Sequence, residues 1–202
     1  MRADDHQNFF KIASDTISQG RTIGFTTDTV WGVGAAPYEE QAVRRIYEQK
    51  QRPDDKALQV LCAEPEVAAS FVSVPDGWLD AWARVVRLWP GALTLVVPAG
   101  PRCPSWLTRD GKVGLRVPDS PFTLRLLRAC GGALAATSLN RSGQPPALTY
   151  EEAVAAGVAD VVLPGEPAGG LASTVYDLTD DRVLRAGAMP EEAIRRALWR
   201  TS

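Results

Sequence analysis

Histidine is almost absent from this chain of 202 residues, in which His6 is the only one. The serine and cysteine nucleophiles of many enzymes depend on a partner histidine, and many metal sites use several histidines. The sequence therefore effectively excludes a Ser-His-Asp site, a Cys-His site and a His-rich metal site. If the protein is an enzyme, its chemistry should rest on positioning and charge neutralisation. Phosphoryl and nucleotidyl transfer work in this way, with Lys, Arg and a metal ion absorbing charge.

Cysteines are few and widely spaced. Cys62, Cys103 and Cys130 are odd in number and form no CxxC pair. This spacing favours reduced cytosolic thiols over a disulfide framework or a zinc site. The chain opens on no basic-then-apolar leader, and no apolar run approaches membrane-spanning length. We therefore expect a cytoplasmic protein without a membrane contact.

Net charge is also small, because 22 Lys and Arg face 24 Asp and Glu, which gives −2. This balance argues against a protein that coats nucleic acid by bulk charge, so any RNA contact would need a local basic patch. The apolar share of 45% and the charged share of 23% are ordinary for a globular protein. A chain of this length buries a substantial core without disulfides.

The chain does contain a regular alternation of helical and strand patterns. Helices are predicted over residues 6–19, 39–49, 76–88 and 121–130, with a brief one from Pro65, one capped by Thr149 and a last one from Pro190 to about Trp199. Strands are predicted over residues 21–27, 58–62, 92–98, 112–117, 133–137, 161–163, 174–178 and 182–186. In the 76–88 helix, Trp78, Leu79 and Trp82 are expected to face inwards. The pattern predicts a single α/β domain over residues 1–202, with its core at about 8–200 and a twisted mixed sheet flanked by helices.

The stretch from Thr26 to Lys56 combines a strand end, a predicted loop with Gly32 and Gly34, a helix and the segment KQRPDDK. One interpretation is that Lys50, Arg52 and Lys56 converge on a phosphate group. The alternative is that these cations cap a helix end and face solvent. The two glycines match neither a dinucleotide fingerprint nor a P-loop, so a bound nucleotide would need another kind of cradle.

Two later loops carry hydroxyl and amide groups. SLNRSG is either a simple turn or a ligand site in which Ser138, Asn140 and Ser142 contact the ligand. Ser173, with the neighbouring Thr174, follows a glycine pair, and glycine-rich approaches of this kind can bind a carboxylate or phosphate through backbone N–H groups. The alternative is a loop that merely enters a strand.

Two arginines lie within or beside apolar strands, Arg116 in KVGLRVP and Arg185 in VLRAG. Because Leu115 and Val117 flank Arg116, the arginine should point to the opposite face of the sheet and find an anion or water there. Its partner is either a structural carboxylate or the carboxylate of a ligand. Arg185 presents the same choice.

Seven motifs then occur in order: TTDTVWGVGA, KQRPDDKAL, WPGALTLVVP, GLRVP, TSLNRSG, ASTVYDL and LRAGAM. Together they resemble the Sua5/YrdC/YciO family of threonylcarbamoyl-AMP synthases, over about Thr22 to Met189. The chain resembles the short form of the family, which has one YrdC-like domain.

The resemblance implies a nucleotidyltransferase. Its substrates would be L-threonine, bicarbonate and ATP with Mg²⁺ held mainly through the ATP phosphates, and its products L-threonylcarbamoyl-AMP and pyrophosphate. This would be the first step of N6-threonylcarbamoyladenosine formation at position 37 of tRNA. The expected partners are the downstream tRNA threonylcarbamoyl-transferase proteins, with a weak contact to tRNA or double-stranded RNA as a further possibility.

The resemblance also assigns roles to residues by motif. It implies a threonine subsite formed by Thr29, Arg116, Ala136 and Ser173. It implies a nucleotide subsite formed by Lys50, Arg52, Lys56, Ser138, Asn140, Ser142 and Arg185, in which Lys50 and Arg52 are catalytic. It implies no side chain as a metal ligand.

Five positions depart from the family pattern: Thr26, Trp31, Leu61, Leu139 and Ala172. Leu139 and Ala172 could reshape the amino-acid pocket. A paralogue, or a hydrogenase-maturation-type domain that handles another carbamoyl-adenylate, is therefore the second hypothesis.

A third hypothesis, from another functional class, is an RNA-binding module. It would hold a phosphate backbone through Lys50, Arg52, Lys56, Arg102 and Arg109.

Overall fold

The computed structural model describes residues 3–54, 56–166 and 168–199. These residues form one nine-stranded sheet in the order β7-β1-β2-β6-β3-β5-β4-β8-β9. The strands are β1 (Ile23–Phe25), β2 (Gly32–Ala35), β3 (Gln59–Cys62), β4 (Leu93–Pro98), β5 (Lys112–Arg116), β6 (Ala133–Ser138), β7 (Val161–Val162), β8 (Thr174–Asp177) and β9 (Arg182–Arg185). The pairs β1–β7, β3–β5 and β4–β8 are parallel and the others antiparallel, so the predicted mixed sheet is confirmed.

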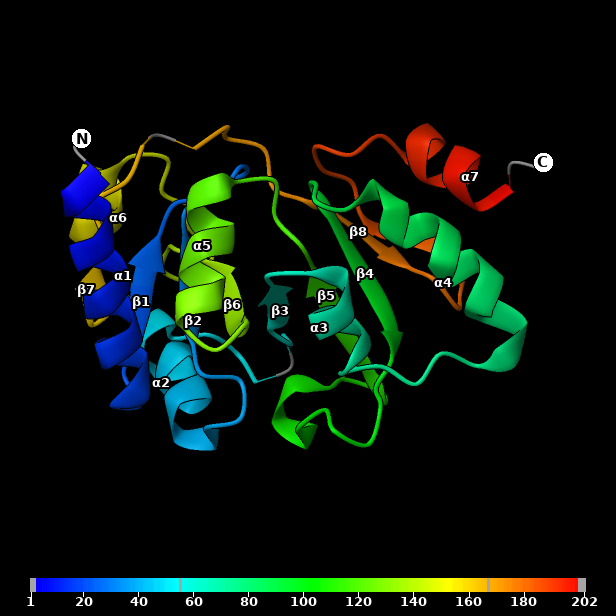
Figure 1. Cartoon of the computed structure of the whole chain (residues 1–202), viewed down its shortest axis with the longest axis horizontal. Helices are drawn as coiled ribbons and strands as arrows, with labels where there is room; N and C mark the ends of the chain where they lie inside the picture. Colours follow the sequence, from blue (N-terminus) through cyan, green and yellow to red (C-terminus); the bar gives the residue numbers. More distant parts are fainter. Residues whose placement is uncertain (1–2, 55, 167, 200–202) are drawn as a thin grey trace.

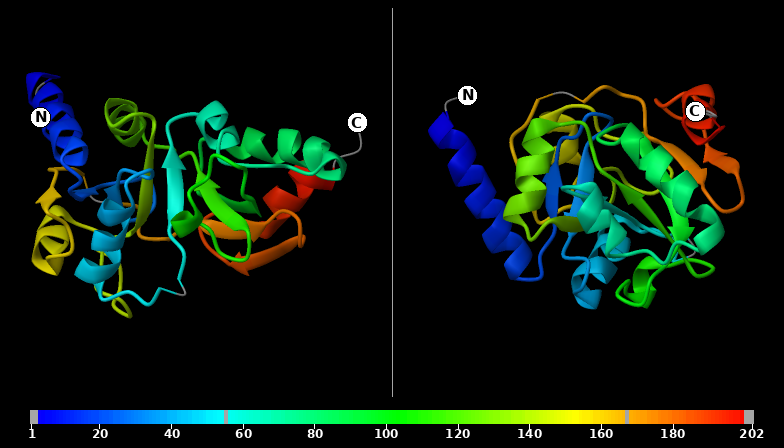
Figure 2. Two further views of the ribbon diagram at one scale, coloured as in Figure 1. Left: turned by 90° about the horizontal axis from the view of Figure 1, so that it is seen from below. Right: turned by 45° about the vertical axis from the view of Figure 1, so that its right-hand side comes forward.

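Helices flank this sheet along its whole length (Figure 1). They are α1 (Ala3–Ser18), α2 (Glu40–Lys50), α3 (Pro65–Ala69), α4 (Leu79–Val85), α5 (Pro121–Ala129), α6 (Tyr150–Ala156) and α7 (Glu191–Trp199). Helices α1 and α5 lie side by side next to β1 and β6, and α2 and α6 lie on the other side of that part of the sheet (Figure 2). Helix α4 packs against α7 at the far end. No helix of the described residues is long and apolar enough to cross a membrane.

Local sequence accounts for several of these elements. Helix α2 buries Ala42, Val43 and Ile46, the stripe that the sequence predicts. Helix α6 begins with the predicted capping box, in which Thr149 and Glu152 satisfy each other's backbone N–H groups. The predicted hairpin near the end of the chain is formed by β8 and β9.

The prediction of a loop at Gly32 and Gly34 is wrong, because both residues belong to strand β2. This strand pairs with β1 on one side and β6 on the other. The ring of Phe25 lies across it, so an added Cβ would stand 3.4 Å from this ring at Gly32 and 3.0 Å at Gly34. The glycines therefore make room for an aromatic side chain within a sheet.

The predicted helix over residues 76–88 is also interrupted. Asp76–Trp78 and Val86–Leu88 are 3-10 turns on either side of α4. Three residues complete a full turn in a 3-10 helix, whereas they cover less than a full turn in an α-helix. The 3-10 turn changes the direction in which the next side chain points, and Leu79, expected inside, is 50% exposed.

Candidate active site

A cavity of about 720 Å³ lies over the middle of the sheet. Its floor consists of alternate residues of four adjacent strand segments: Gln59 and Leu61; Lys112, Gly114 and Arg116; Thr94 and Val96; Ser173, Val175 and Asp177. The residues between them, such as Leu95 and Leu115, are buried in the core. Successive side chains of a strand point to opposite faces of the sheet, so the same short segments supply both the floor of the cavity and the apolar core beneath it.

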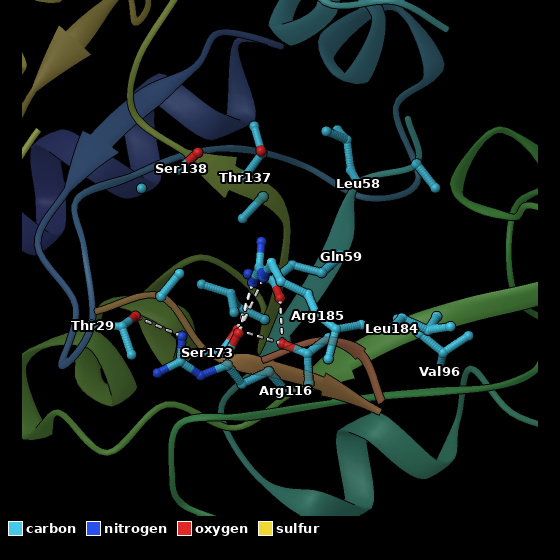
Figure 3. A pocket seen from close by; sticks show the side chains of 18 of the residues that line it. Thr29, Leu58, Gln59, Val96, Arg116, Thr137, Ser138, Ser173, Leu184 and Arg185 are labelled. Carbon is cyan, nitrogen blue, oxygen red and sulfur yellow. Dashed lines mark hydrogen bonds between the residues drawn. The ribbon is translucent and has the colours of Figure 1, made fainter. Parts of the chain in front are cut away.

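Arg116 lies at one end of the cavity, next to Thr29 (Figure 3). It is 2% exposed, and its Nε donates a hydrogen bond to the carbonyl of Gly91. One terminal nitrogen donates to Thr29 Oγ1 at 2.8 Å, and the other lies 2.6 Å from both carboxylate oxygens of Asp28. Burial lowers the pKa of Arg116, and the Asp28 carboxylate opposes this effect. The structural carboxylate that the sequence left open as a partner is therefore Asp28.

Sequence reasoning missed Asp28, although it lies within the TTDTV motif. The signal was available, since a carboxylate next to a strand end is a ready partner for an arginine in an apolar strand. The pair matters because a buried arginine requires a counter-charge or hydrogen bonds to nearly every N–H group.

Lys50 lies outside the cavity wall. It is 1% exposed, and its ammonium group donates hydrogen bonds to the carbonyls of Ser138 and Asn140, both at 2.5 Å, and to Asn140 Oδ1 at 3.3 Å. Its own carbonyl accepts from the backbone N–H of Ser142. Burial, and secondly the like charge of Arg52, lower the pKa of Lys50 to about 8. Lys50 therefore joins the end of α2 to the SLNRSG loop.

Arg52 is the member of the predicted cation group that lines the cavity. Its Nε donates to the carbonyl of Lys56 and a terminal nitrogen to that of Ala57. Lys56 is exposed and, like Lys50, lies outside the cavity lining. The predicted convergence of three cations on one point is therefore wrong in its geometry for Lys50, whose ammonium faces two backbone carbonyls. The role of Lys50 and Lys56 in nucleotide binding stays a prediction.

Arg185 supplies a second cation to the cavity wall. It donates to the backbone carbonyl of Ser173 at 2.8 Å and to the hydroxyl of Ser173 at 3.3 Å. Partial burial, and secondly the like charge of Arg52, lower the pKa of Arg185. Two arginines thus repel each other in the same cavity, and an anion between them would relieve this repulsion.

The end of the cavity opposite Arg116 is lined by Thr137 and Ser138 (Figure 3). Asn140 also lines the cavity, and its Oδ1 accepts a 2.6 Å hydrogen bond from the hydroxyl of Ser138. Ala136 contributes to the wall from strand β6. Ser142, predicted to be part of the site, lies outside the lining, and its backbone N–H is held by Lys50.

A further group of charges in the cavity lining was not predicted for the site. The ammonium of Lys112 lies 2.7 Å from Asp177 and 3.0 Å from Asp180, and all three line the cavity, as does Arg182. Within the described residues, no three His, Cys, Asp or Glu side chains are placed to hold one metal ion.

The five departures from the family pattern lie at different places relative to the cavity. Leu61 and Ala172 line the cavity, so they bear on the shape of a ligand pocket. Leu139 is fully buried, and an added Cβ on Gly24 would stand only 2.7 Å from its Cδ1, so it packs into the core away from the cavity. The expectation that Leu139 reshapes the pocket is therefore wrong.

Thr26 and Trp31 belong to the structural framework of the site. The hydroxyl of Thr26 donates to the carbonyl of Glu166, which anchors the segment after β7. Trp31 lines the cavity but is fully buried, with its ring centroid 6.1 Å from that of Tyr150.

The group of cations proposed for RNA binding is also changed by the structure. The ammonium of Lys50 is buried against carbonyls, so it presents no charge to a phosphate backbone at the surface. Arg109 lines the cavity and Arg102 is exposed.

Comparisons with known proteins add to this geometry. The chain is 38% identical to the threonylcarbamoyl-AMP synthase of Escherichia coli strain K12 over 180 residues, which cover 87% of the chain and 94% of that protein. Its structure is similar to that of Pyrococcus abyssi Sua5 complexed with L-threonine, with a TM-score of 0.85 and 33% identity. That match covers 94% of this chain but 57% of the longer Sua5 chain.

Two further comparisons concern the fold and the family. Escherichia coli YciO shares the fold, with a TM-score of 0.82, 24% identity, and coverage of 96% of this chain and 93% of that chain. The sequence model of the Sua5/YciO/YrdC family, described as telomere recombination, matches residues 15–187. With most of its length matched in this way, the chain belongs to the Sua5/YciO/YrdC family.

Proposed function

We propose that this protein synthesises L-threonylcarbamoyl-AMP from L-threonine, bicarbonate and ATP and releases pyrophosphate. The similarity to the E. coli synthase over 94% of that enzyme's length supports this reaction, as does the likeness to a Sua5 that binds L-threonine. The product would be the intermediate for threonylcarbamoylation of adenosine 37 in tRNA, passed on to a transferase that acts on tRNA. The predicted cytoplasmic location forms part of the same proposal.

The observation that carries the proposal is the distribution of cations in one cavity. Arg116, beside Thr29, is suited to the threonine carboxylate, and Ala136 and Ser173 complete the same subsite. Arg52 and Arg185 repel each other and are suited to phosphate groups, with Ser138 and Asn140 beside the nucleotide. A ligand with a carboxylate at one end and phosphates at the other matches this arrangement.

The chemistry follows from these positions. Threonine's amino nitrogen combines with bicarbonate to give a carbamate and water. A carbamate oxygen then attacks the α-phosphorus of ATP, the bond to the β-phosphate oxygen breaks, and pyrophosphate leaves. Charge develops on the phosphate oxygens during this step, so Arg52 and Arg185 stabilise the transition state. Mg²⁺, if bound together with ATP, would neutralise further phosphate charge beside Arg52 and Arg185.

Lys50 has an indirect part in this proposal. Its ammonium protons are directed at the carbonyls of Ser138 and Asn140 and at Asn140 Oδ1. Lys50 therefore holds the loop that carries the proposed nucleotide contacts, including Ser142. Lys56 is an exposed cation, and we propose that it lies near the bound nucleotide.

The division into two subsites is tested by Arg52→Ala and Arg185→Ala. Each is expected to raise the Kd for ATP tenfold or more, because each removes a cation from the phosphate side. Arg52→Ala should also leave the Kd for L-threonine within threefold, whereas Arg185 contacts Ser173 and its variant is compared for ATP alone. Calorimetric titration measures both constants, and circular dichroism checks the fold. Arg87→Ala, at an exposed arginine of the Val86–Leu88 turn, is the matched control. Unchanged ATP affinity in both cavity variants would contradict the proposal.

A further inference from the structure

A line of hydrogen bonds crosses the floor of the cavity. Gln59 in β3, Thr94 in β4 and Ser173 immediately before β8 come from three separate segments of the chain. Thr94 Oγ1 lies 2.7 Å from Gln59 Oε1 and 2.9 Å from Ser173 Oγ. Strand β5 runs between β3 and β4, and its Gly114 has no side chain to separate Gln59 from Thr94.

The direction of these hydrogen bonds follows from counting protons. Gln59 Oε1 is an acceptor only, so Thr94 uses its single hydroxyl proton to donate to it. Thr94 then has only lone pairs for Ser173, and Ser173 must be the donor in the 2.9 Å contact. The proton of Ser173 is therefore directed at Thr94 and is not offered to a ligand.

Ser173 Oγ is left with its two lone pairs. One accepts a hydrogen bond from a terminal nitrogen of Arg185 at 3.3 Å. The other is available to a ligand in the cavity, which Ser173 lines. A hydroxyl in this state repels a carboxylate oxygen and attracts an N–H group.

We propose that Thr94 and Gln59 are positioning residues that make Ser173 a hydrogen-bond acceptor for the amino group of the amino-acid substrate. The inference rests on the proposed function and adds how the site distinguishes the two ends of the amino acid. Arg116 takes the carboxylate and Ser173 takes an N–H. One N–H remains on the nitrogen after it becomes a carbamate, so the same contact persists through the reaction.

Burial makes the arrangement specific. Thr94 and Ser173 are each 2% exposed, so water does not readily replace a lost partner in this line. Removing the Thr94 hydroxyl or the Gln59 acceptor frees the Ser173 hydroxyl to turn and present its proton to the substrate nitrogen, where an acceptor is needed.

The test compares Thr94→Val, which removes the hydroxyl at nearly constant shape, with Thr94→Ser, which keeps it. Calorimetric titration with L-threonine is expected to give a Kd at least tenfold higher for Thr94→Val and within threefold of wild type for Thr94→Ser. Thr174→Val is the matched control, because Thr174 is equally buried but its hydroxyl donates to the carbonyl of Met189 outside the cavity lining. Its Kd should stay within threefold of wild type.

A second pair of variants keeps the test valid if Thr94→Val does not fold. Gln59 is only partly buried, so substitution there leaves the core intact. Gln59→Leu removes the acceptor and is expected to raise the Kd at least tenfold, whereas Gln59→Glu keeps an acceptor oxygen and should stay within threefold. Equal affinities in Gln59→Leu and Gln59→Glu would overturn the proposal.

A deaminated analogue separates positioning from a general structural effect. (R)-3-Hydroxybutanoate is L-threonine without its amino group, and its Kd can be measured by competition. The wild type should prefer L-threonine strongly, and Thr94→Val should reduce this preference at least fivefold. An unchanged preference would overturn the role of Thr94. A wild-type protein that fails to bind L-threonine would overturn the proposed function itself.

Discussion

Asp28 and Arg116 form an ion pair in which both side chains are largely withdrawn from water, with 15% and 3% of their side-chain surfaces exposed. Asp28 therefore keeps the guanidinium of Arg116 in place before any ligand binds. Asp28 also provides a counter-charge for Arg116. A ligand carboxylate then meets an arginine that is already fixed by Gly91, Thr29 and Asp28, at a small entropic cost.

Replacing Asp28 by Ala leaves the buried Arg116 without its counter-charge. The expected loss is about 3–5 kcal/mol in the free energy of unfolding, the usual range for removing one partner of a buried pair. Urea denaturation measures it. Asp15→Ala is the matched control, because its pair with Lys11 is exposed, and it should change stability by less than about 0.5 kcal/mol. Equal midpoints for the two variants would show that the buried pair contributes nothing.

The residue scale is where sequence reasoning succeeded and failed most clearly. Arg116 was recognisable because a charge flanked by two apolar strand residues must face a polar site. The side-chain direction of Lys50 was predicted wrongly. The segment KQRPDDK does not indicate that its first lysine is buried while Arg52 lines the cavity. The outcome depends on the carbonyls of Ser138 and Asn140, which lie far away in the chain and reach Lys50 only after folding.

Strand β2 is the element on which the site and the sheet both depend. Its glycines lie under the ring of Phe25, and its neighbour β6 carries Ala136 and Ser138 to the cavity. Sequence patterns predicted a loop here because glycine pairs usually mark turns. The strand pairs with β1 and β6 and packs its glycines under Phe25, and no local sequence pattern records these tertiary contacts.

Two matched glycine variants test this interpretation of β2. In Gly34→Ala the new methyl group would stand 3.0 Å from the Phe25 ring, whereas in Gly32→Ala its closest neighbours are at 3.4–3.5 Å. Gly34→Ala is expected to be less stable than Gly32→Ala by about 1–3 kcal/mol, the usual cost of overpacking. Thermal unfolding should show a gap of a few degrees, at about 2–4 °C per kcal/mol for a chain of this size. Equal melting temperatures would contradict the packing account.

Asp160 ties helix α2 to the start of β1. Its carboxylate accepts hydrogen bonds from Arg45, from Gln49 and from the backbone N–H of Thr22. Burial by itself raises the pKa of Asp160, but Arg45 and Thr22 outweigh it and lower the pKa to about 2. Because the folded pKa is below the unfolded value of about 3.9, the stabilisation is present above pH 4 and is lost as the pH falls through 2.

The pH dependence gives a test of this anchor. The difference in unfolding free energy between wild type and Asp160→Asn should be on the order of 2 kcal/mol at pH 6 and should shrink between pH 4 and pH 2. Denaturant titrations at each pH measure it, and other titrating groups cancel in the difference. A difference that stays constant from pH 6 to pH 2 would count against the carboxylate's role.

At the scale of the whole molecule, alternation of strands and helices was sufficient to predict a mixed α/β sheet. The strand order could not be predicted from the sequence, because strands that are distant in the chain are neighbours in the sheet: β5 lies between β3 and β4, and β6 lies next to β2. Only this order brings Gln59, Thr94 and Ser173 into one line. The sequence therefore predicted several cavity residues one by one, but not the hydrogen-bonded floor that connects them.

The same order fits the proposal that one domain holds two anionic ligands. In the proposed function, β5 and the residue before β8 contribute to the amino-acid end, β9 and the segment after α2 contribute to the nucleotide end, and β6 contributes to both. Both ends open into one cavity, which is what a direct attack of one substrate on the other requires.

Pyrophosphate release is the measurement that tests this account most directly. The protein is incubated with ATP, Mg²⁺ and bicarbonate, and each of the twenty amino acids is added in turn. The account predicts release that depends on L-threonine and on bicarbonate, and that falls at least a hundredfold in Arg52→Ala while circular dichroism shows an intact fold. Release that proceeds equally well without threonine, or with another amino acid in its place, would contradict it.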